Sequence, residues 1–220
     1  MNVKGGPQPV RKSRREESAE ATRVALVETA RALFAGRGYA DVSIDEITEG
    51  TRVTRGALYH HFEDKRALFH AVVEAVERDL TEEVRRKARS ERDSWERLRT
   101  ACDAYLDACL APEVQRIVVL DAPPVLSWRA WCEIDKRYGL GVFAEHLAAA
   151  RDAGLLAAQS VETAAQLLLG ALNTGARVIT DAADKGAART AVHETIDRLL
   201  SGFRVGDRAD GKRERNGRRR

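Results

Sequence analysis

Two adjacent histidines, His60 and His61, follow Tyr59 in a segment that also carries arginines and a lysine. Histidine can ligate a metal ion, act as a general base or hydrogen-bond to a partner molecule. A shared metal ion is disfavoured, because consecutive residues on a helix point about 100° apart and no cysteine lies nearby. Catalysis is disfavoured because no nucleophile is placed to pair with an imidazole. We therefore expect no metal ligands and no catalytic residues here, and favour a contact surface.

Short helices with defined starts are predicted to position this segment. Ser43 and Glu46, three residues apart, form a capping box in which each side chain satisfies a free N–H at a helix start. Thr54 is predicted to cap the next short helix, "RGALYHHF". Asp64 is predicted to cap a much longer helix that follows. The chain thus places two short helices in succession, joined by a turn at Arg52.

Two short helices joined by a tight turn match the plan of a helix–turn–helix. In such a unit Arg55 can pair with two acceptors of guanine, and His60 can donate or accept a hydrogen bond. Gly56 is small enough to let the helix lie close to the groove wall, while Leu58 and Phe62, four apart, should face inward. The residues predicted to contact DNA are Ser43, Thr54, Arg55, Gly56, Tyr59, His60, His61 and Lys65.

The charge distribution also favours a polyanionic partner. The net charge is +3, with charged residues at 32% and hydrophobic residues at 44% of the chain. Residues 1–17 carry +3 and residues 204–220 carry +5, which leaves the body between them at −5. Basic ends on an acidic body suggest arms that bind a polyanion, or else solubilising tails. The three cysteines form no CxxC pair, and no apolar segment is long enough to span a membrane, so a cytoplasmic protein is expected.

The periodicity of apolar residues predicts an all-α fold of about nine helices. No region alternates with period two over a useful length. The clearest interior break is predicted at "DAPP", residues 121–124, and Gly154 should end the helical segment that follows. The expected organisation is a disordered basic arm at 1–17, a three-helix DNA-binding domain at 18–70, a helical bundle at 71–203, and a disordered basic tail at 204–220.

Across residues 22–69 the chain resembles the DNA-binding domain of the TetR family of bacterial transcription regulators. The agreement includes "A..LF...GY" of the first helix, "S..EI" of the second, and "V-T-x-G-x-L-Y-x-H-F-x-x-K-x-x-L" from Val53 to Leu68. Two positions depart from the family pattern. Thr51-Arg52 replaces the usual Ala-Gly of the turn, where a left-handed backbone would cost arginine about 1 kcal/mol. Ile47-Thr48 replaces a common Ile-Ala, and Gly50 is expected to help the turn adjust.

The resemblance implies a homodimer that binds an inverted repeat of double-stranded DNA, with the last two helices of each chain forming a four-helix bundle. It also implies that the bundle at 71–203 is a ligand-binding and dimerisation domain for a small-molecule effector, with no catalytic activity and no cofactor. Two alternatives remain open: a protein that binds nucleic acid non-specifically, and a helical small-molecule carrier. The residues predicted to line the ligand pocket are Tyr105, Cys109, Trp128, Trp131, Phe143, His146 and Asn173.

Overall fold

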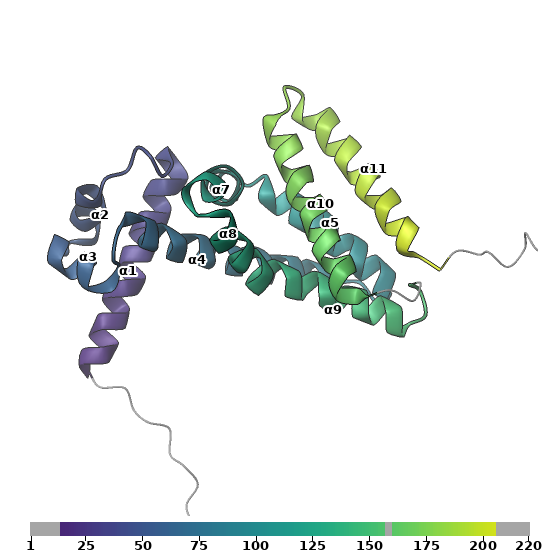
Figure 1. The fold of residues 1–220 in the computed structure, drawn as a ribbon, viewed down its shortest axis with the longest axis horizontal. Coiled ribbons are helices and arrows are strands. Elements are labelled where there is room, and N and C mark those ends of the chain that lie inside the picture. Colours follow the sequence, from purple (N-terminus) through teal and green to yellow (C-terminus); the bar gives the residue numbers. More distant parts are fainter. Residues whose placement is uncertain (1–13, 157–159, 206–220) are drawn as a thin grey trace, which may run out of the picture. The chain divides into compact units, whose positions relative to one another are not determined.

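The computed structural model describes residues 14–156 and 160–205, and within them the predicted all-α fold is confirmed (Figure 1). One isolated bridge, between Leu156 and Arg204, accompanies the helices. The predicted basic arms lie largely outside the described residues, at 1–13 and 206–220. The elements are α1 (Arg14–Arg37), α2 (Ile44–Thr51), α3 (Arg55–His61), α4 (Lys65–Ala88), α5 (Ser94–Cys109), α6 (Pro112–Val114), η1 (Gln115–Asp121), α7 (Ala122–Val125), α8 (Trp128–Asp135), η2 (Lys136–Leu140), α9 (Gly141–Asp152), α10 (Val161–Asp181) and α11 (Lys185–Phe203).

The elements η1 and η2 are π-helical turns that continue the α-helices beside them. Residues 112–125 and 128–152 are therefore two uninterrupted helical stretches, and the described part of the chain holds nine such stretches. By its internal contacts the chain divides into two compact units after Val72, within α4. No helix among the described residues is long and apolar enough to cross a membrane.

In the first unit α1, α2 and α3 pack against one another around a small apolar core. Leu26, Phe34, Ile47 and Leu58 are fully buried there. The helix α1 begins at Arg14, so the expectation that residues 14–17 belong to a disordered arm is wrong. Gly38, with φ of 86°, ends α1, and its N–H donates to the carbonyl of Phe34 at 2.8 Å.

In the second unit α5 packs against α9, α10 and α11. The predicted α5 face is buried, from Trp95 and Leu98 to Tyr105 and Cys109. The helix α10 packs in turn against α9 and α11, and Gly175 allows the close approach to α11. A Cβ atom at Gly175 would come within 2.7 Å of a methyl group of Val192.

The break predicted at residues 121–124 is wrong. The backbone N–H of Ala122 donates to the carbonyl of Ile117, a π-helical bond, and the helix continues through α7 to Val125. Pro123 and Pro124 lie at the start of α7, directly after the π-helical turn, and donate no N–H to the preceding carbonyls. The carbonyl of Val119 instead accepts a hydrogen bond from Arg177 Nη1 at 3.4 Å.

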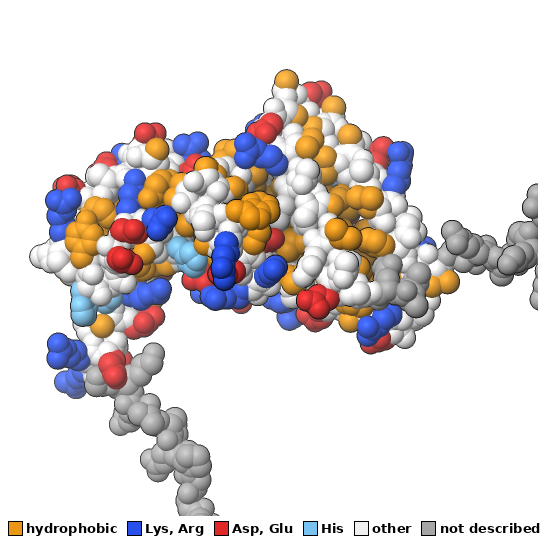
Figure 2. Space-filling model, in the orientation of Figure 1, with side chains coloured by type: hydrophobic (Ala, Val, Ile, Leu, Met, Phe, Trp, Pro, Cys, Tyr) orange, Lys and Arg blue, Asp and Glu red, His pale blue; other side chains and the backbone are white. Residues whose placement is uncertain are grey.

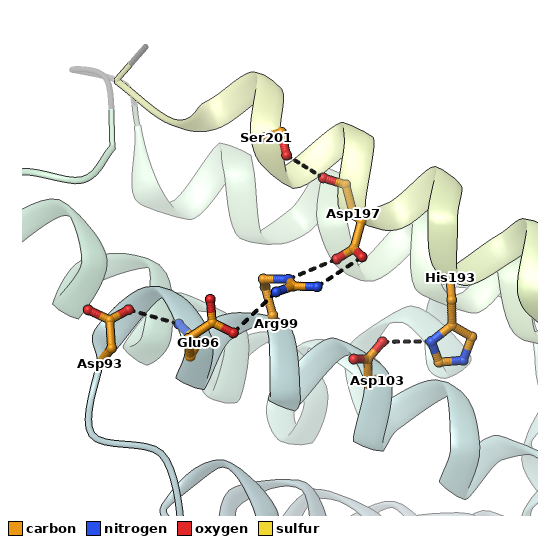
Figure 3. Close-up of polar contacts among 7 residues, drawn as sticks. All are labelled: Asp93, Glu96, Arg99, Asp103, His193, Asp197 and Ser201. Atoms are coloured by element: carbon orange, nitrogen blue, oxygen red, sulfur yellow. Dashed lines mark hydrogen bonds and ion pairs between the residues drawn. The ribbon is translucent and has the colours of Figure 1, made fainter. Parts of the chain in front are cut away.

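A row of charged contacts joins α5 to α11 (Figure 3). The guanidinium of Arg99 donates to both carboxylate oxygens of Asp197, at 3.0 and 3.1 Å. Asp103 lies 2.6 Å from Nδ1 of His193, and Arg189 donates to Asp107 at 2.6 Å. These contacts hold one side of α11 against its own chain.

Candidate nucleic-acid interface and interior cavity

The helix α3 is held by its cap and by its inward side chains. The hydroxyl of Thr54 accepts a hydrogen bond from the N–H of Ala57 at 3.2 Å, which confirms the predicted cap. Leu58 and Phe62 are buried as predicted. The guanidinium of Arg23, from α1, lies 5.2 Å from the centre of the Phe62 ring. With these side chains inward, the opposite face of α3 is left in water.

The turn between α2 and α3 depends on Arg52. Its φ is 60° and its ψ is 38°, the left-handed conformation that the glycine of the family pattern would adopt without strain. Among the described residues no other non-glycine has a positive φ. Gly50 lies inside α2 and is not part of the turn, contrary to the expectation that it would help the turn adjust. It instead lets α2 approach α1, since a Cβ there would meet the Thr29 methyl group at 2.9 Å.

Of the eight residues predicted to contact DNA, six are exposed and two are half-buried. Those exposed are Ser43, Thr54, Arg55, Gly56, Tyr59 and His60, and those half-buried are His61 and Lys65. Tyr59 is 50% exposed. Arg55 Nε lies 3.0 Å from an Asp45 carboxylate oxygen, and both side chains are exposed. Such a surface ion pair is weak, so an anion can compete with Asp45 for Arg55.

Ser43 has a structural role in addition to its predicted contact. Its N–H and its hydroxyl both donate to the Glu46 carboxylate at 2.8 Å, and its hydroxyl accepts from the Glu46 N–H at 3.3 Å. Hydrogen bonds from Arg37, then from Ser43, lower the pKa of Glu46 to about 2. The predicted capping box is confirmed, and Glu46 also ties α2 to the end of α1.

Lys65 begins α4 and is positioned by an aromatic cluster. Its ammonium lies 4.2 Å from the centre of the Tyr39 ring. Tyr39 in turn packs against Phe34 and Phe69, at centroid distances of 5.7 and 4.8 Å. Burial lowers the pKa of Lys65. The contact between Tyr39 and Lys65 was not predicted from the sequence, although Tyr39 belongs to the "GY" of the first-helix motif.

The second unit contains a cavity of about 520 Å³. Five of the predicted pocket residues meet there, namely Tyr105, Cys109, Trp128, Trp131 and Asn173. The lining residues that were not predicted are Val118, Val119, Pro123, Cys132, Asp135, Lys136, Leu140, Gln166, Leu169, Gly170, Thr174 and Arg177. The elements that bring them together are α5, η1, α7, α8, η2 and α10.

Phe143 and His146 do not line this cavity, contrary to prediction. Phe143 is fully buried and packs edge-on against Tyr105, with ring centres 5.6 Å apart. His146 is buried on α9, and burial lowers the pKa of its imidazole. These residues lie one turn apart on the α9 face that is buried in the core. The periodicity identified that face correctly but did not show which elements surround the cavity.

Polar groups are linked along one part of the cavity wall. The Tyr105 hydroxyl donates to the Asn173 side-chain carbonyl at 2.6 Å, and the Asn173 amide donates to Asp135 Oδ2 at 3.2 Å. The other carboxylate oxygen of Asp135 is buried without a hydrogen-bond partner. Burial raises the pKa of Asp135 to about 6. The sequence held no local indication of this role, because Asp135 lies among other charged residues of α8.

In the first unit the short helices α2 and α3 are joined by a tight turn, and α3 is capped and exposed. This arrangement is a helix–turn–helix. The second unit is all-helical and contains a cavity. Residues 26–72 match the model of the bacterial regulatory proteins of the tetR family. Residues 95–203 match the tetracycline repressor-like C-terminal domain. A solved TetR-family transcriptional regulator from Pectobacterium atrosepticum is 35% identical, with a TM-score of 0.77, and the match covers 89% of this chain and 99% of that one.

Two curated relatives agree with this. The transposon Tn10 TetC protein of Escherichia coli is 31% identical over 59% of this chain and 66% of its own length. The transcriptional regulator AcrR of Shigella flexneri is 33% identical over 47% of this chain and 49% of its own. The chain thus spans about half to two thirds of these relatives. The chain belongs to the TetR family and is a DNA-binding transcriptional regulator.

Proposed function

We propose that this protein is a cytoplasmic repressor that binds an inverted-repeat operator as a homodimer and is released by a small molecule in the interior cavity. The observation that carries the proposal is the exposed face of α3. This face presents Arg55 and Tyr59 to solvent, while Leu58 of the same helix is buried. Arginine can pair bidentately with guanine in the major groove, and tyrosine can donate to a phosphate.

An inverted-repeat operator is bound by two recognition helices, which requires a second copy of the chain. The surface of α10 and α11 is the candidate interface between the two copies. Large apolar side chains stay exposed there: Leu167 at 65%, Val178 at 50% and Leu199 at 47%. They border a groove between α10 and α11 that is otherwise lined mainly by small and branched residues. Figure 2 shows apolar side chains over these two helices. An exposed apolar surface of this kind is typical of a subunit interface.

Not every apolar side chain of α10 and α11 is available for a dimer contact. The side chains of Leu168, Leu172, Ile179 and Ile196 are buried within their own chain. Apolar residues occur on two neighbouring stripes of α10, and the stripe with the stronger apolar character serves the intrachain core. The stripe one residue away, which includes Leu167, is left for a partner.

The effector part of the proposal is supported by the cavity of the second unit. Its apolar and aromatic walls carry a few converging polar groups, the usual make-up of a small-molecule site. Asp135 and Asn173 are two of the polar groups at its wall, which also carries Lys136, Gln166, Thr174 and Arg177. A hundredfold loss of operator affinity on effector binding requires a coupling free energy of about 2.7 kcal/mol.

Selection of bound sequences from random duplex DNA tests the proposal. We expect the purified protein to enrich an inverted repeat whose half-sites are about one helical turn apart. Arg55→Ala and Tyr59→Ala should fail to enrich it, while Arg198→Ala, an exposed arginine of α11, should behave like the unmodified protein. Binding with a steep salt dependence but no enriched sequence would instead indicate a non-specific nucleic-acid-binding protein.

A further inference from the structure

A second buried carboxyl group lies close to the polar part of the cavity. Glu77, on α4, is 1% exposed, and its Oε2 has no hydrogen-bond partner. Burial, and then the charge of Asp135, raises the pKa of Glu77 to about 8. The charge of Glu77 also raises the pKa values of Tyr105 and Cys109, after the larger effect of burial. Glu77 therefore lies within electrostatic reach of three residues that line the cavity.

Neither carboxyl group is neutralised from within the protein. Across residues 14–156 and 160–205, no lysine, arginine or histidine forms an ion pair with Glu77 or Asp135. The nearby Arg137 is engaged by Glu74. Buried carboxylates are normally paired or protonated. Two carboxyl groups, one on the cavity wall and one close to it, thus each keep an oxygen without a hydrogen-bond donor.

The positive charges on the cavity wall do not meet this need. Arg177 pairs with Asp181 at 2.8 Å, and both side chains are about half exposed. Lys136 is exposed at the surface. Trp128 and Trp131 line the same cavity, with ring centres 5.1 Å apart and ring planes tilted by 34°. Indole rings attract cations through their faces, so the aromatic and the acidic parts of the wall favour the same ligand charge.

We propose that the cavity takes an organic cation, a hydrophobic amine whose ammonium group lies against Asp135 and whose apolar part lies along Trp128 and Trp131. The inference rests on the proposed function, because it names the class of effector for the same cavity. An anionic ligand of the same size would meet the Asp135 carboxyl group, and a neutral ligand would bring no charge to it. The ammonium supplies donors for the free oxygen of Asp135 and favours the charged form of Glu77.

Cation binding should therefore release protons. At neutral pH the Glu77 carboxyl group still holds most of its proton, since its pKa is about 8. A positive charge in the cavity lowers that pKa, and the proton passes to the buffer. Tyr105 and Cys109 keep their protons, because burial raises their pKa values further. Proton release is a readout that a purely structural role of Glu77 would not give.

Calorimetric titration of the full chain, without DNA, tests the inference with three probes of one shape. They are naphthylethylamine, naphthylethanol and naphthylacetate, each titrated near pH 7 in two buffers of different ionisation enthalpy. We expect the amine to bind roughly tenfold tighter than the other two, or more, and to release protons. Preference for the alcohol or the carboxylate, or binding of none at millimolar concentration, would overturn the inference.

Three isosteric variants locate the effect. Asp135→Asn should reduce the preference for the amine roughly tenfold, and Glu77→Gln should bind the amine while releasing fewer protons. Glu133→Gln, which removes an exposed carboxylate of α8, is the matched control and should change neither quantity. An Asp135→Asn protein with an undiminished preference for the amine would also overturn the inference.

A separate operator-release assay distinguishes failure of this inference from failure of the proposed function. If the amine binds through Asp135 but leaves the operator complex intact, the cation site stands and the effector function fails. If only neutral or acidic compounds bind and release the operator, the effector function stands and the cation site is rejected.

Discussion

The two units of this protein place their functional groups in opposite environments. In the first unit Arg55 and Tyr59 lie in water on one short helix, within a contiguous stretch of the sequence. In the second unit Asp135, Asn173 and Glu77 come from three distant helices and converge in the interior. The first arrangement suits a highly charged partner that supplies its own electrostatic attraction. The second suits a small ligand that exchanges contacts with water for contacts with the cavity wall.

This difference determines how much folding free energy each site costs. The exposed pair of Arg55 and Asp45 is screened by solvent and contributes little to stability. The buried Glu77 forms no ion pair within the described part of the chain, and its charged form is costly. The surface site can therefore be changed with little effect on folding, whereas a change in the interior should alter stability and ligand binding together.

The largest expected effect is a gain in unfolding free energy on substitution of Glu77 by glutamine, at pH values near 8. The pKa of Glu77 is raised from 4.5 to about 8, so between these pH values the folded state holds a proton that the unfolded chain has lost. The unfolding free energy of the unmodified protein should therefore fall as pH rises through this window. Glutamine does not titrate, so the unfolding free energy of Glu77→Gln should not fall in this way. Its unfolding free energy should exceed that of the unmodified protein by a few kcal/mol near pH 8.

Denaturant unfolding at pH 5 and pH 8 measures this advantage, with Glu133→Gln as the exposed control. The pKa of Asp135 is raised from 3.8 to about 6, so the unfolding free energy should also fall, by a smaller amount, as pH rises between these values. This second fall should occur both in the unmodified protein and in Glu77→Gln. An advantage of Glu77→Gln that stays the same at both pH values would contradict the assigned pKa shift.

The next effect concerns packing in the second unit. Gly175→Ala places a methyl group within 2.7 Å of Val192, and this overpacking should cost about 1–3 kcal/mol of unfolding free energy. Gly170→Ala, on the same helix, meets nothing within 4 Å and should not destabilise. Thermal unfolding of the two variants in parallel makes the comparison. Equal stability would show that α10 and α11 are not in close contact at Gly175.

The two units also differed in how far the sequence could predict them. The helix caps at Ser43 and Thr54, and the inward Leu58, follow from interactions within a few residues, and they are confirmed. The cavity depends on which helices surround it, so the aromatic and polar lining residues were only partly found. Phe143 shared their residue type but lies in the core. Asp135 carried no pattern that separated it from a solvated carboxylate.

The break expected at 121–124 has a similar cause. Two consecutive prolines usually end a helix, and the sequence alone gave no reason to expect otherwise. The π-helical turn η1 leads directly into α7, and Arg177 provides a donor to the carbonyl of Val119. That donor comes from α10, 58 residues along the chain, and so belongs to tertiary structure.

For the surface site the sharpest variant is Gly56→Ala. A Cβ at Gly56 has open space around it, with the nearest atom, Thr54 Oγ1, at 3.9 Å. Because alanine favours helix over glycine, the unfolding free energy should not fall. If α3 lies close against a groove wall, the added methyl group should reduce operator affinity roughly tenfold, a loss of about 1.4 kcal/mol. Full operator affinity in this variant would show that Gly56 does not face the DNA.

The smallest expected effect lies at the turn between α2 and α3. Arg52 holds a φ of 60°, which costs a non-glycine residue about 1–2 kcal/mol. Arg52→Gly removes this strain, but glycine adds freedom to the unfolded chain at a cost of about 0.5–1 kcal/mol. The net gain in unfolding free energy should therefore be about 0.5–1 kcal/mol.

Arg52→Ala is the matched control, because alanine keeps the Cβ atom and the strain that goes with it. Both variants lose the same exposed positive charge, so any electrostatic change in DNA affinity should be equal in the two. A difference in stability between them isolates the backbone conformation of the turn. If glycine gave no advantage over alanine in denaturant unfolding, the left-handed turn would be wrong, and with it the angle at which α3 is presented to the DNA.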